Sequence, residues 1–299
     1  MKISVIIPAH NEEKSIKKTI NSILNSTYSN YEIIVVDNGS TDKTKEIIKS
    51  FKNKKINYYF YDKKRGPAAA RNYGALKANG EIIFFVDADD WLRKDNLKVI
   101  VDNVKKYPKL NLFIIFRKNV FEKGFKKLWS FEFFSYEHYG KKWYKKNSEI
   151  LKECAFCPYV WKKNFFNKIK GFDENIFYFE DEILYNKLVQ LKEPCLSVAN
   201  AEYYTNMGNS FDDFFKRAKN LGRGIASVKK INKILYLLIT NLSFIFLINP
   251  YIFLAYFLIS SVYWLRVSKS FEISVFAPFL WIFKKIISFY YMIFYFLKL

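Results

Sequence analysis

Cysteine, glycine and proline are scarce in this chain of 299 residues, which contains 3 Cys, 10 Gly and 7 Pro. Three cysteines cannot form the disulfide framework of a small secreted domain, because one of them must remain unpaired. So little glycine and proline also excludes a collagen-like or linker-like protein. Since 51% of the residues are hydrophobic and 20% are aromatic, the chain is too apolar to be disordered. The composition predicts a folded protein in a reducing compartment.

Acidic residues are few, with 28 Asp and Glu against 49 Lys and Arg, which gives a formal net charge of +21. Such a charge attracts nucleic acid, an anionic membrane face or phosphate-bearing substrates. The excess is concentrated in residues 101–170, which carry a net +11 and include aromatic residues such as Trp129 and Trp143. This mixture suits the headgroup layer of an anionic bilayer. Solvated lysines over a partly buried aromatic face are an equally good interpretation.

Long uncharged runs occur only near the C-terminus, at residues 234–265 and, interrupted by Lys284 and Lys285, at 273–297. A helix of 32 residues at ~1.5 Å each would exceed a hydrocarbon layer of ~30 Å, so Pro250 predicts a kinked span or a short hairpin. Basic residues between 216 and 233 place that side in the cytoplasm. We therefore expect a protein of the cell membrane with a cytoplasmic domain (1–215), a basic juxtamembrane linker (216–233) and a membrane-attached helical region (234–299).

Short β-branched runs alternate with amphipathic segments through the first 116 residues. Strands are expected at residues 3–7, 32–36, 57–61, 82–86 and 111–116, and helices at 12–24, 41–51, 66–79 and 95–107. Asn11 is the expected cap of the first helix, and Ser40 or Thr41 that of the second. Repeated strand–helix units predict an α/β fold, with a Rossmann-like, mainly parallel sheet covered by helices on both faces.

Polar clusters follow three of the expected strands, at residues 8–12, 37–40 and 87–90. Ligands of such sheets bind outside the carboxyl ends of the strands, so these clusters indicate one site. Asp87 and Asp89 offer carboxylate oxygens suited to Mg²⁺ or Mn²⁺ beside a phosphate, although a helix cap or an Asx turn explains many Asp-x-Asp patterns. Arg71 is a candidate contact to a phosphate or a base, and a plain surface role is the alternative.

Several motifs, in this order, resemble glycosyltransferase family 2 with its GT-A fold. The resemblance covers about residues 1–220, and the motifs that carry it are Ile3–Glu12, Val35–Asp42, Ala70–Gly74, Phe85–Trp91, Gly171–Glu174 and Phe179–Leu184. It implies inverting transfer of a sugar from a nucleoside diphosphate, with Mn²⁺ or Mg²⁺ as cofactor. The same resemblance assigns the nucleotide-sugar pocket to Pro8, Ala9, Asn11, Glu12, Asp37, Arg71, Asp87, Ala88 and Asp89.

The resemblance also implies specific roles for four carboxylates. Asp87 would approach the ribose, Asp89 would hold the metal together with Asp87, and Asp181 would be the general base, with Glu180 orienting Asp181 or the acceptor. An acidic helix N-terminus stabilised by the helix dipole is the structural alternative for Glu180 and Asp181.

The chain departs from the family pattern at two positions and lacks one motif. Asn38 stands where a second Asp is frequent, and His10 where an aromatic residue is frequent. A Gln-x-x-Arg-Trp pattern does not follow Asp181, which favours addition of one sugar over polymerisation.

The expected function is transfer from a UDP- or GDP-sugar to a lipid-linked or glycan acceptor at the cytoplasmic face of the membrane, with no nucleic-acid partner. Two alternatives remain open. One is a membrane-bound basic binding module with an inactive α/β core. The other is a nucleotidyltransferase, which also needs paired aspartates and a metal.

Overall fold

The computed structural model describes residues 1–61, 66–119, 148–152, 159–176 and 180–205, together with Leu258 and Ser261. Apart from these two isolated residues, the described parts belong to one compact unit formed by residues 1–120 and 140–206. The predicted linker and most of the predicted membrane region lie outside them. Within the described parts, no helix has the length and apolarity needed to cross a membrane.

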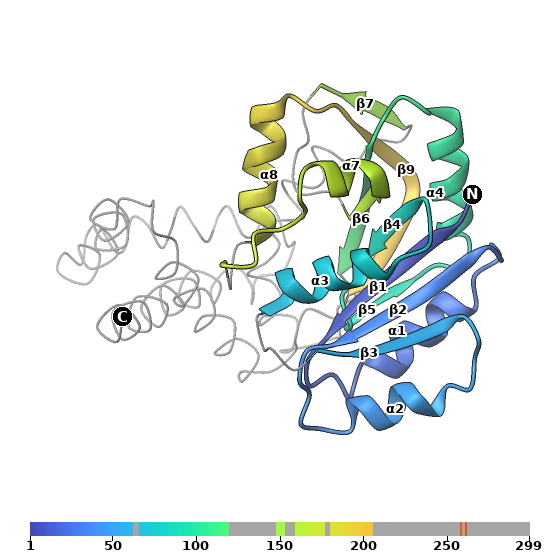
Figure 1. Ribbon diagram of the computed structural model, residues 1–299. Helices are drawn as coiled ribbons and strands as arrows, with labels where there is room; N and C mark the ends of the chain where they lie inside the picture. Colours follow the sequence, from blue (N-terminus) through green and yellow to red (C-terminus); the bar gives the residue numbers. More distant parts are fainter. Residues whose placement is uncertain are drawn as a thin grey trace, which may run out of the picture. The chain divides into compact units, whose positions relative to one another are not determined.

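A single mixed sheet runs through this unit (Figure 1). Its strands are β1 (Ile3–Ala9), β2 (Tyr31–Asp37), β3 (Ile56–Phe60), β4 (Ile82–Phe85), β5 (Asp90–Leu92), β6 (Leu112–Asn119), β7 (Glu149–Leu151), β8 (Val160–Lys162) and β9 (Cys195–Thr205). Their order is β3-β2-β1-β4-β8-β6-β9-β5, and β7 pairs with β9.

The predicted parallel arrangement is found for β3, β2, β1 and β4. Beyond β4 the sheet departs from the repeated strand–helix pattern, because β8 runs antiparallel between β4 and β6. Strand β9 then pairs in parallel with β6 and antiparallel with β5 and β7. The first half of the sheet therefore positions the predicted loops, and the second half extends the sheet with segments from later in the chain.

Helices cover both faces of the sheet, as predicted. Helices α1 (Ile16–Leu24), α2 (Thr44–Ser50) and α4 (Asn96–Lys106) pack on one face, and α3 (Gly66–Lys77), α7 (Lys163–Lys168) and α8 (Glu180–Leu191) on the other. Successive side chains of a strand point to opposite faces. On β1, for example, Val5 and Ile7 join the core beneath α1, while Ile6 joins the core beneath α3.

Small residues form the face of helix α3 that packs on the sheet. Ala68, Ala70 and Ala75 are buried. At Gly74, an added Cβ atom would lie 2.4 Å from Cγ2 of Ile6 and 3.3 Å from Cγ2 of Val36. Only glycine permits this approach without a shift of the helix or of the strands.

The first two helices begin later than predicted. Asn11 adopts a left-handed conformation with φ of 58°, so the chain turns before α1 instead of starting a helix there. The Asn11 side chain accepts a hydrogen bond from the Thr41 amide over 2.8 Å and caps no helix. At α2 the cap residue is Lys43, whose side chain makes no cap bond, so the predicted cap by Ser40 or Thr41 is wrong. Oδ1 of the preceding Asp42 accepts the Thr44 amide over 3.0 Å.

Candidate active site

The carboxyl ends of the parallel strands meet at one edge of the sheet. Ala9, the last residue of β1, is level with Asp37, which is in turn level with Phe60 at the end of β3. Strand β4 ends nearby, where the Val86 amide donates to the Ile6 carbonyl over 3.0 Å. The three polar clusters predicted at this edge therefore follow neighbouring strands of the parallel half.

The loops after β1 and β2 are joined by hydrogen bonds. The Asn38 amide donates to the Ala9 carbonyl over 2.8 Å, and Nδ1 of His10 lies 3.0 Å from the Asn38 carbonyl oxygen. The contact of Asn11 with Thr41 adds a further link. These bonds make the two loops one connected wall, with Pro8 half-buried and Ala9 buried at its base.

Asp37, the last residue of β2, is completely buried and fixes the loop that follows this strand. Its Oδ1 accepts the Ser40 amide and its Oδ2 accepts the Tyr58 hydroxyl, both over 2.8 Å. Burial and the hydrogen bond to Asp37 raise the pKa of Tyr58, which keeps its hydroxyl protonated as the donor. Both oxygens of Asp37 thus have partners within the protein, and the residue shapes the loop predicted to bind nucleotide.

Asn38 has a side-chain oxygen that is buried without a hydrogen-bond partner in the described part of the chain. Only 9% of the residue is exposed. A buried acceptor left unpaired costs about 1–3 kcal/mol, so this oxygen is suited to accept from a ligand. Glu12, opposite in the first loop, instead accepts the Ser15 hydroxyl over 2.6 Å.

Three aspartates gather between the end of β4 and the first residue of β5. Asp87, Asp89 and Asp90 each place a carboxylate oxygen within 4.8 Å of the others. Ala88 between them is buried, and its carbonyl accepts the hydroxyl of Thr19 from α1 over 2.7 Å, which fixes the loop. All-oxygen donor sets suit Mg²⁺ and Mn²⁺. Asp90 belongs to the predicted polar cluster at 87–90 but not to the predicted metal pair of Asp87 and Asp89, so it is a third candidate ligand that the sequence pattern missed.

Arg71 of α3 joins this acidic loop to the N-terminus of α8. Its Nη2 lies 2.9 Å from Oδ1 of Asp87, and its Nη1 lies 2.6 Å from Oε1 of Glu180. Burial alone lowers the pKa of the Arg71 guanidinium, but the two carboxylates outweigh it and raise the pKa, so the group stays charged. No sequence pattern predicts this bridge, because 109 residues separate Arg71 from Glu180.

The first turn of α8 carries Glu180, Asp181 and Glu182. Burial raises the pKa of Glu180; Arg71 opposes this shift and Asp181 adds to it, and the net direction is upward. Asp181 is exposed, and its Oδ1 accepts the Glu182 amide over 2.9 Å. The arrangement therefore combines a buried carboxylate paired with Arg71 and an adjacent exposed carboxylate able to accept a proton.

Sequence comparison identifies the family of this architecture. The family model "Glycosyl transferase family 2" matches residues 4–165, more than half of the chain. An uncharacterized glycosyltransferase of Haemophilus influenzae is 45% identical over 98 residues, which cover 32% of this chain and 39% of that protein. The chain thus spans less than half of that relative.

Solved structures of two glycosyltransferases share the fold. The structure of S. aureus TarS residues 1–349 in complex with UDP-GlcNAc has a TM-score of 0.58 at 22% identity, covering 77% of this chain and 68% of that one. The mannosyltransferase PcManGT from Pyrobaculum calidifontis, in complex with GDP-Man and Mn²⁺, has a TM-score of 0.55 at 19% identity, with coverages of 75% and 63%. These likenesses support the predicted GT-A-like α/β fold.

Proposed function

Because this chain belongs to glycosyl transferase family 2, we propose that it transfers a sugar from a UDP- or GDP-sugar to a lipid-linked or glycan acceptor. The observation that carries the proposal is the bridge through Arg71, which connects the acidic loop after β4 to the acidic end of α8. Sugar transfer needs one group of residues around the diphosphate and another beside the acceptor hydroxyl. The nucleotide-sugars bound by TarS and PcManGT support this class of donor.

The proposed reaction is a single displacement with inversion at the anomeric carbon. The acceptor oxygen forms a bond to that carbon as the bond from the carbon to the diphosphate oxygen breaks. The acceptor proton passes to the exposed carboxylate of Asp181, and the bonding electron pair leaves with the nucleoside diphosphate. Glu180, paired with Arg71, orients the helix end that carries Asp181.

A divalent cation fits the acidic loop. Asp87 and Asp89 would hold Mg²⁺ or Mn²⁺, and the closeness of the three carboxylates after β4 supports this assignment. When bound, the ion supplies electrostatic stabilisation for the charge that develops on the leaving diphosphate. The neighbour with GDP-Man contains Mn²⁺, which supports the same choice of cation.

The nucleotide would lie against the wall formed by the loops after β1 and β2. The buried oxygen of Asn38 would accept an N–H group of the base, which satisfies an acceptor that otherwise has no partner in the described structure. Both uracil and guanine carry such a donor, so Asn38 is compatible with UDP-sugars and with GDP-sugars.

The proposal for the acceptor depends on the amino-acid sequence of residues 216–297, which lie almost entirely outside the described residues. The uncharged runs at 234–265 and 273–297 and the basic residues between 216 and 233 favour attachment to the cytoplasmic face of a cell membrane. Attachment there would bring the active site to a lipid-linked or glycan acceptor.

A donor screen followed by a transfer assay tests the function. Purified full-length protein is incubated with Mn²⁺ and individual UDP- and GDP-sugars, and protection against thermal unfolding is measured. A donor at 100 times its Kd adds about 2.7 kcal/mol of stability. Transfer of labelled sugar to a membrane lipid extract is then followed with the protecting donor. Absence of both protection and turnover, with folded protein, would overturn the proposal.

The role of Asp181 is tested separately. The D181N variant should lose transfer and keep the donor affinity of the wild-type protein. The E182Q variant, which changes the next residue of the same exposed turn, serves as the control and should keep both. Loss of donor binding in D181N would contradict its role as general base.

A further inference from the structure

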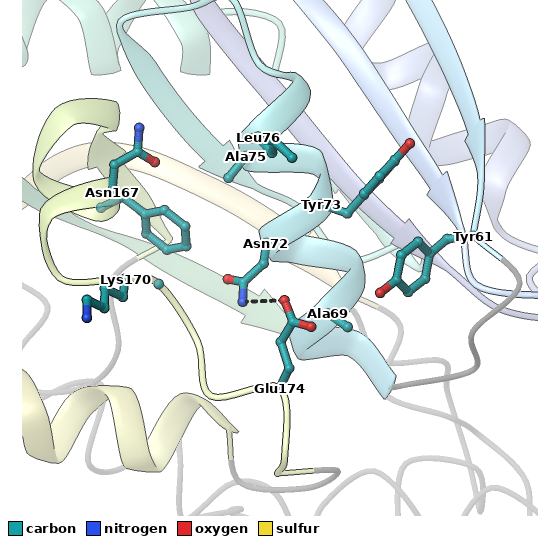
Figure 2. A pocket seen from close by; sticks show the side chains of 11 residues that line it. Tyr61, Ala69, Asn72, Tyr73, Ala75, Leu76, Asn167, Lys170 and Glu174 are labelled. Carbon is teal, nitrogen blue, oxygen red and sulfur yellow. Dashed lines mark hydrogen bonds between the residues drawn. The ribbon is translucent and has the colours of Figure 1, made fainter.

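Asn72, the residue after Arg71 on α3, holds the backbone of the loop between α7 and α8. Its Oδ1 accepts the Phe172 amide over 3.0 Å, and its Nδ2 donates to the Phe172 carbonyl over 2.9 Å. The same Nδ2 donates to Oε1 of Glu174 over 3.1 Å. Figure 2 shows the Asn72 amide directed from the helix toward the Glu174 carboxylate, along a groove of about 340 Å³. One side chain thus satisfies three polar groups of the loop.

Phe172 anchors the same loop in the core. Its ring lies 5.5 Å from the ring of Phe85, the last residue of β4, and 5.8 Å from that of Phe166 in α7. The Arg71 guanidinium lies 5.5 Å from the centre of the Phe172 ring, on which it makes a cation–π contact. Arg71 and Asn72 therefore both contact Phe172, one through its ring and the other through its backbone.

Gly171 makes the close approach of this loop to α3 possible. Its φ of +56° lies in the left-handed region that glycine adopts readily. An added Cβ atom would lie 2.5 Å from Oδ1 of Asn72 and 2.9 Å from the ring of Phe166. A side chain at position 171 would therefore push directly on the hydrogen-bonded pair formed by Asn72 and Phe172.

Two adjacent residues of α3 thus hold the chain on either side of residues 177–179, which lie outside the described residues. Asn72 binds Phe172, and Arg71 binds Glu180, the residue before Asp181. We infer that Asn72 is a positioning residue that places the acidic end of α8 for proton removal from the acceptor. This inference rests on the proposed glycosyltransferase function, and it assigns to Asn72 an effect on the rate of transfer with little effect on donor affinity.

The hydrogen-bond partners of the Asn72 side chain explain why we expect an effect on the rate of transfer and little effect on donor affinity. All three bonds made by the Asn72 side chain end on the loop at 172–174, whereas Arg71 contacts the acidic loop itself through Asp87. Loosening the loop should displace the base from the acceptor, and a displacement of about 1 Å can reduce a rate by roughly 100-fold.

The N72D variant tests the inference with a nearly isosteric change. The new carboxylate can still accept the Phe172 amide, but it cannot donate to the Phe172 carbonyl and it faces the Glu174 carboxylate. We expect kcat to fall at least about tenfold, with donor Kd within about twofold of the wild-type value. The double variant N72D/E174Q restores a donor opposite position 72 and should recover part of the lost kcat. The N167A variant, an exposed change on the same groove, should match the wild-type protein.

A second measurement does not depend on turnover. Backbone hydrogen exchange of residues 180–184 should be faster in N72D than in wild-type protein and should slow again in N72D/E174Q. If wild-type protein shows no transfer, the proposed function fails while the exchange data still report on the contact. Unchanged exchange and unchanged kcat in N72D, or an equal fall in donor affinity and kcat without recovery in N72D/E174Q, would overturn the inference.

Discussion

Arg71 of α3 and Glu180 of α8 lie 109 residues apart in the chain and form an ion pair of 2.6 Å. About nine-tenths of each side chain is buried. Arg71 also holds Asp87 in the loop after β4, so one guanidinium neutralises carboxylates from both sides of the proposed site. Removing it would leave two acidic groups in a poorly solvated place with no shared cation.

The R71A variant should therefore lose about 3–5 kcal/mol of stability, because it leaves buried charge unpaired. Chemical unfolding at neutral pH measures the change. The matched control is K98A, which breaks the exposed ion pair of Lys98 with Asp102 and should cost less than about 0.5 kcal/mol. Equal losses in the two variants would show that the Arg71 bridge contributes no more than a surface pair.

The hydrogen bond from Thr19 to the Ala88 carbonyl is expected to stabilise the acidic loop. The T19V variant keeps the shape of the side chain and leaves a buried carbonyl without its donor, at a cost of about 1–3 kcal/mol. It should also weaken binding of Mn²⁺, measured by titration, because the loop that carries Asp87 and Asp89 loses its support. The T27V variant removes an exposed bond of the same kind, to Lys94, and should change neither quantity. Wild-type Mn²⁺ affinity in T19V would refute the proposed support.

Gly74 is expected to tolerate no larger residue. The G74A change gains about 1 kcal/mol of helix propensity, but its Cβ would overlap Ile6, and such overpacking costs about 1–3 kcal/mol. We expect net destabilisation, measured as a lower urea midpoint, together with a weaker donor affinity as α3 shifts. Leu76 on the same helix is 73% exposed, and L76A should lie within about 0.5 kcal/mol of wild type. A stabilised G74A would show that propensity prevails over packing.

Glu32 is expected to make the free energy of unfolding decrease as the pH falls into the acidic range, because its pKa is lowered in the folded protein. Burial raises its pKa, but hydrogen bonds from Ser4, Asn79 and Lys2 together outweigh burial, and the net shift is downward. The unfolded chain then binds more protons than the folded one below pH ~4.5, so the contribution of Glu32 is present above that pH and is lost as the pH falls through the lowered pKa.

The stability advantage of wild type over E32Q should accordingly shrink on acidification from pH 6 to pH 3. Urea unfolding at several pH values measures it, and E81Q, which changes an exposed carboxylate, is the control. An advantage that is constant or grows toward low pH would contradict the downward shift.

The parallel half of the fold could be predicted from the sequence because its signals are local. Buried β-branched runs alternate with amphipathic segments, and the strands found at Ile3–Ala9 and Tyr31–Asp37 extend those expected by only a few residues. The acidic loop was predictable for the same reason, since Asp87 and Asp89 directly follow a buried run.

The rest depends on contacts between distant segments that carry no local signal. The insertion of β8 between β4 and β6 is decided by pairing across dozens of residues, and so is the register of β9. The bridge from Arg71 to Glu180 and the hold of Asn72 on Phe172 arise only once α8 and its preceding loop lie against α3. Helix α1 starts later than predicted because the backbone of Asn11 is left-handed. The residue type did not predict this, since asparagine is also a favourable helix cap.

Helix α3 packs on the sheet at Gly74 with no space for a Cβ atom, while Arg71 and Asn72 bind two different parts of the proposed site. Because Arg71 contacts both Asp87 and Glu180, we expect a ligand that displaces the loop after β4 to shift the start of α8, and a ligand at the start of α8 to shift that loop. Thermodynamic reciprocity requires each of two such ligands to change the affinity of the other by the same factor. Measuring the affinity for one substrate in the presence and absence of the other would therefore give the coupling free energy that helix α3 carries between the loop after β4 and the start of α8.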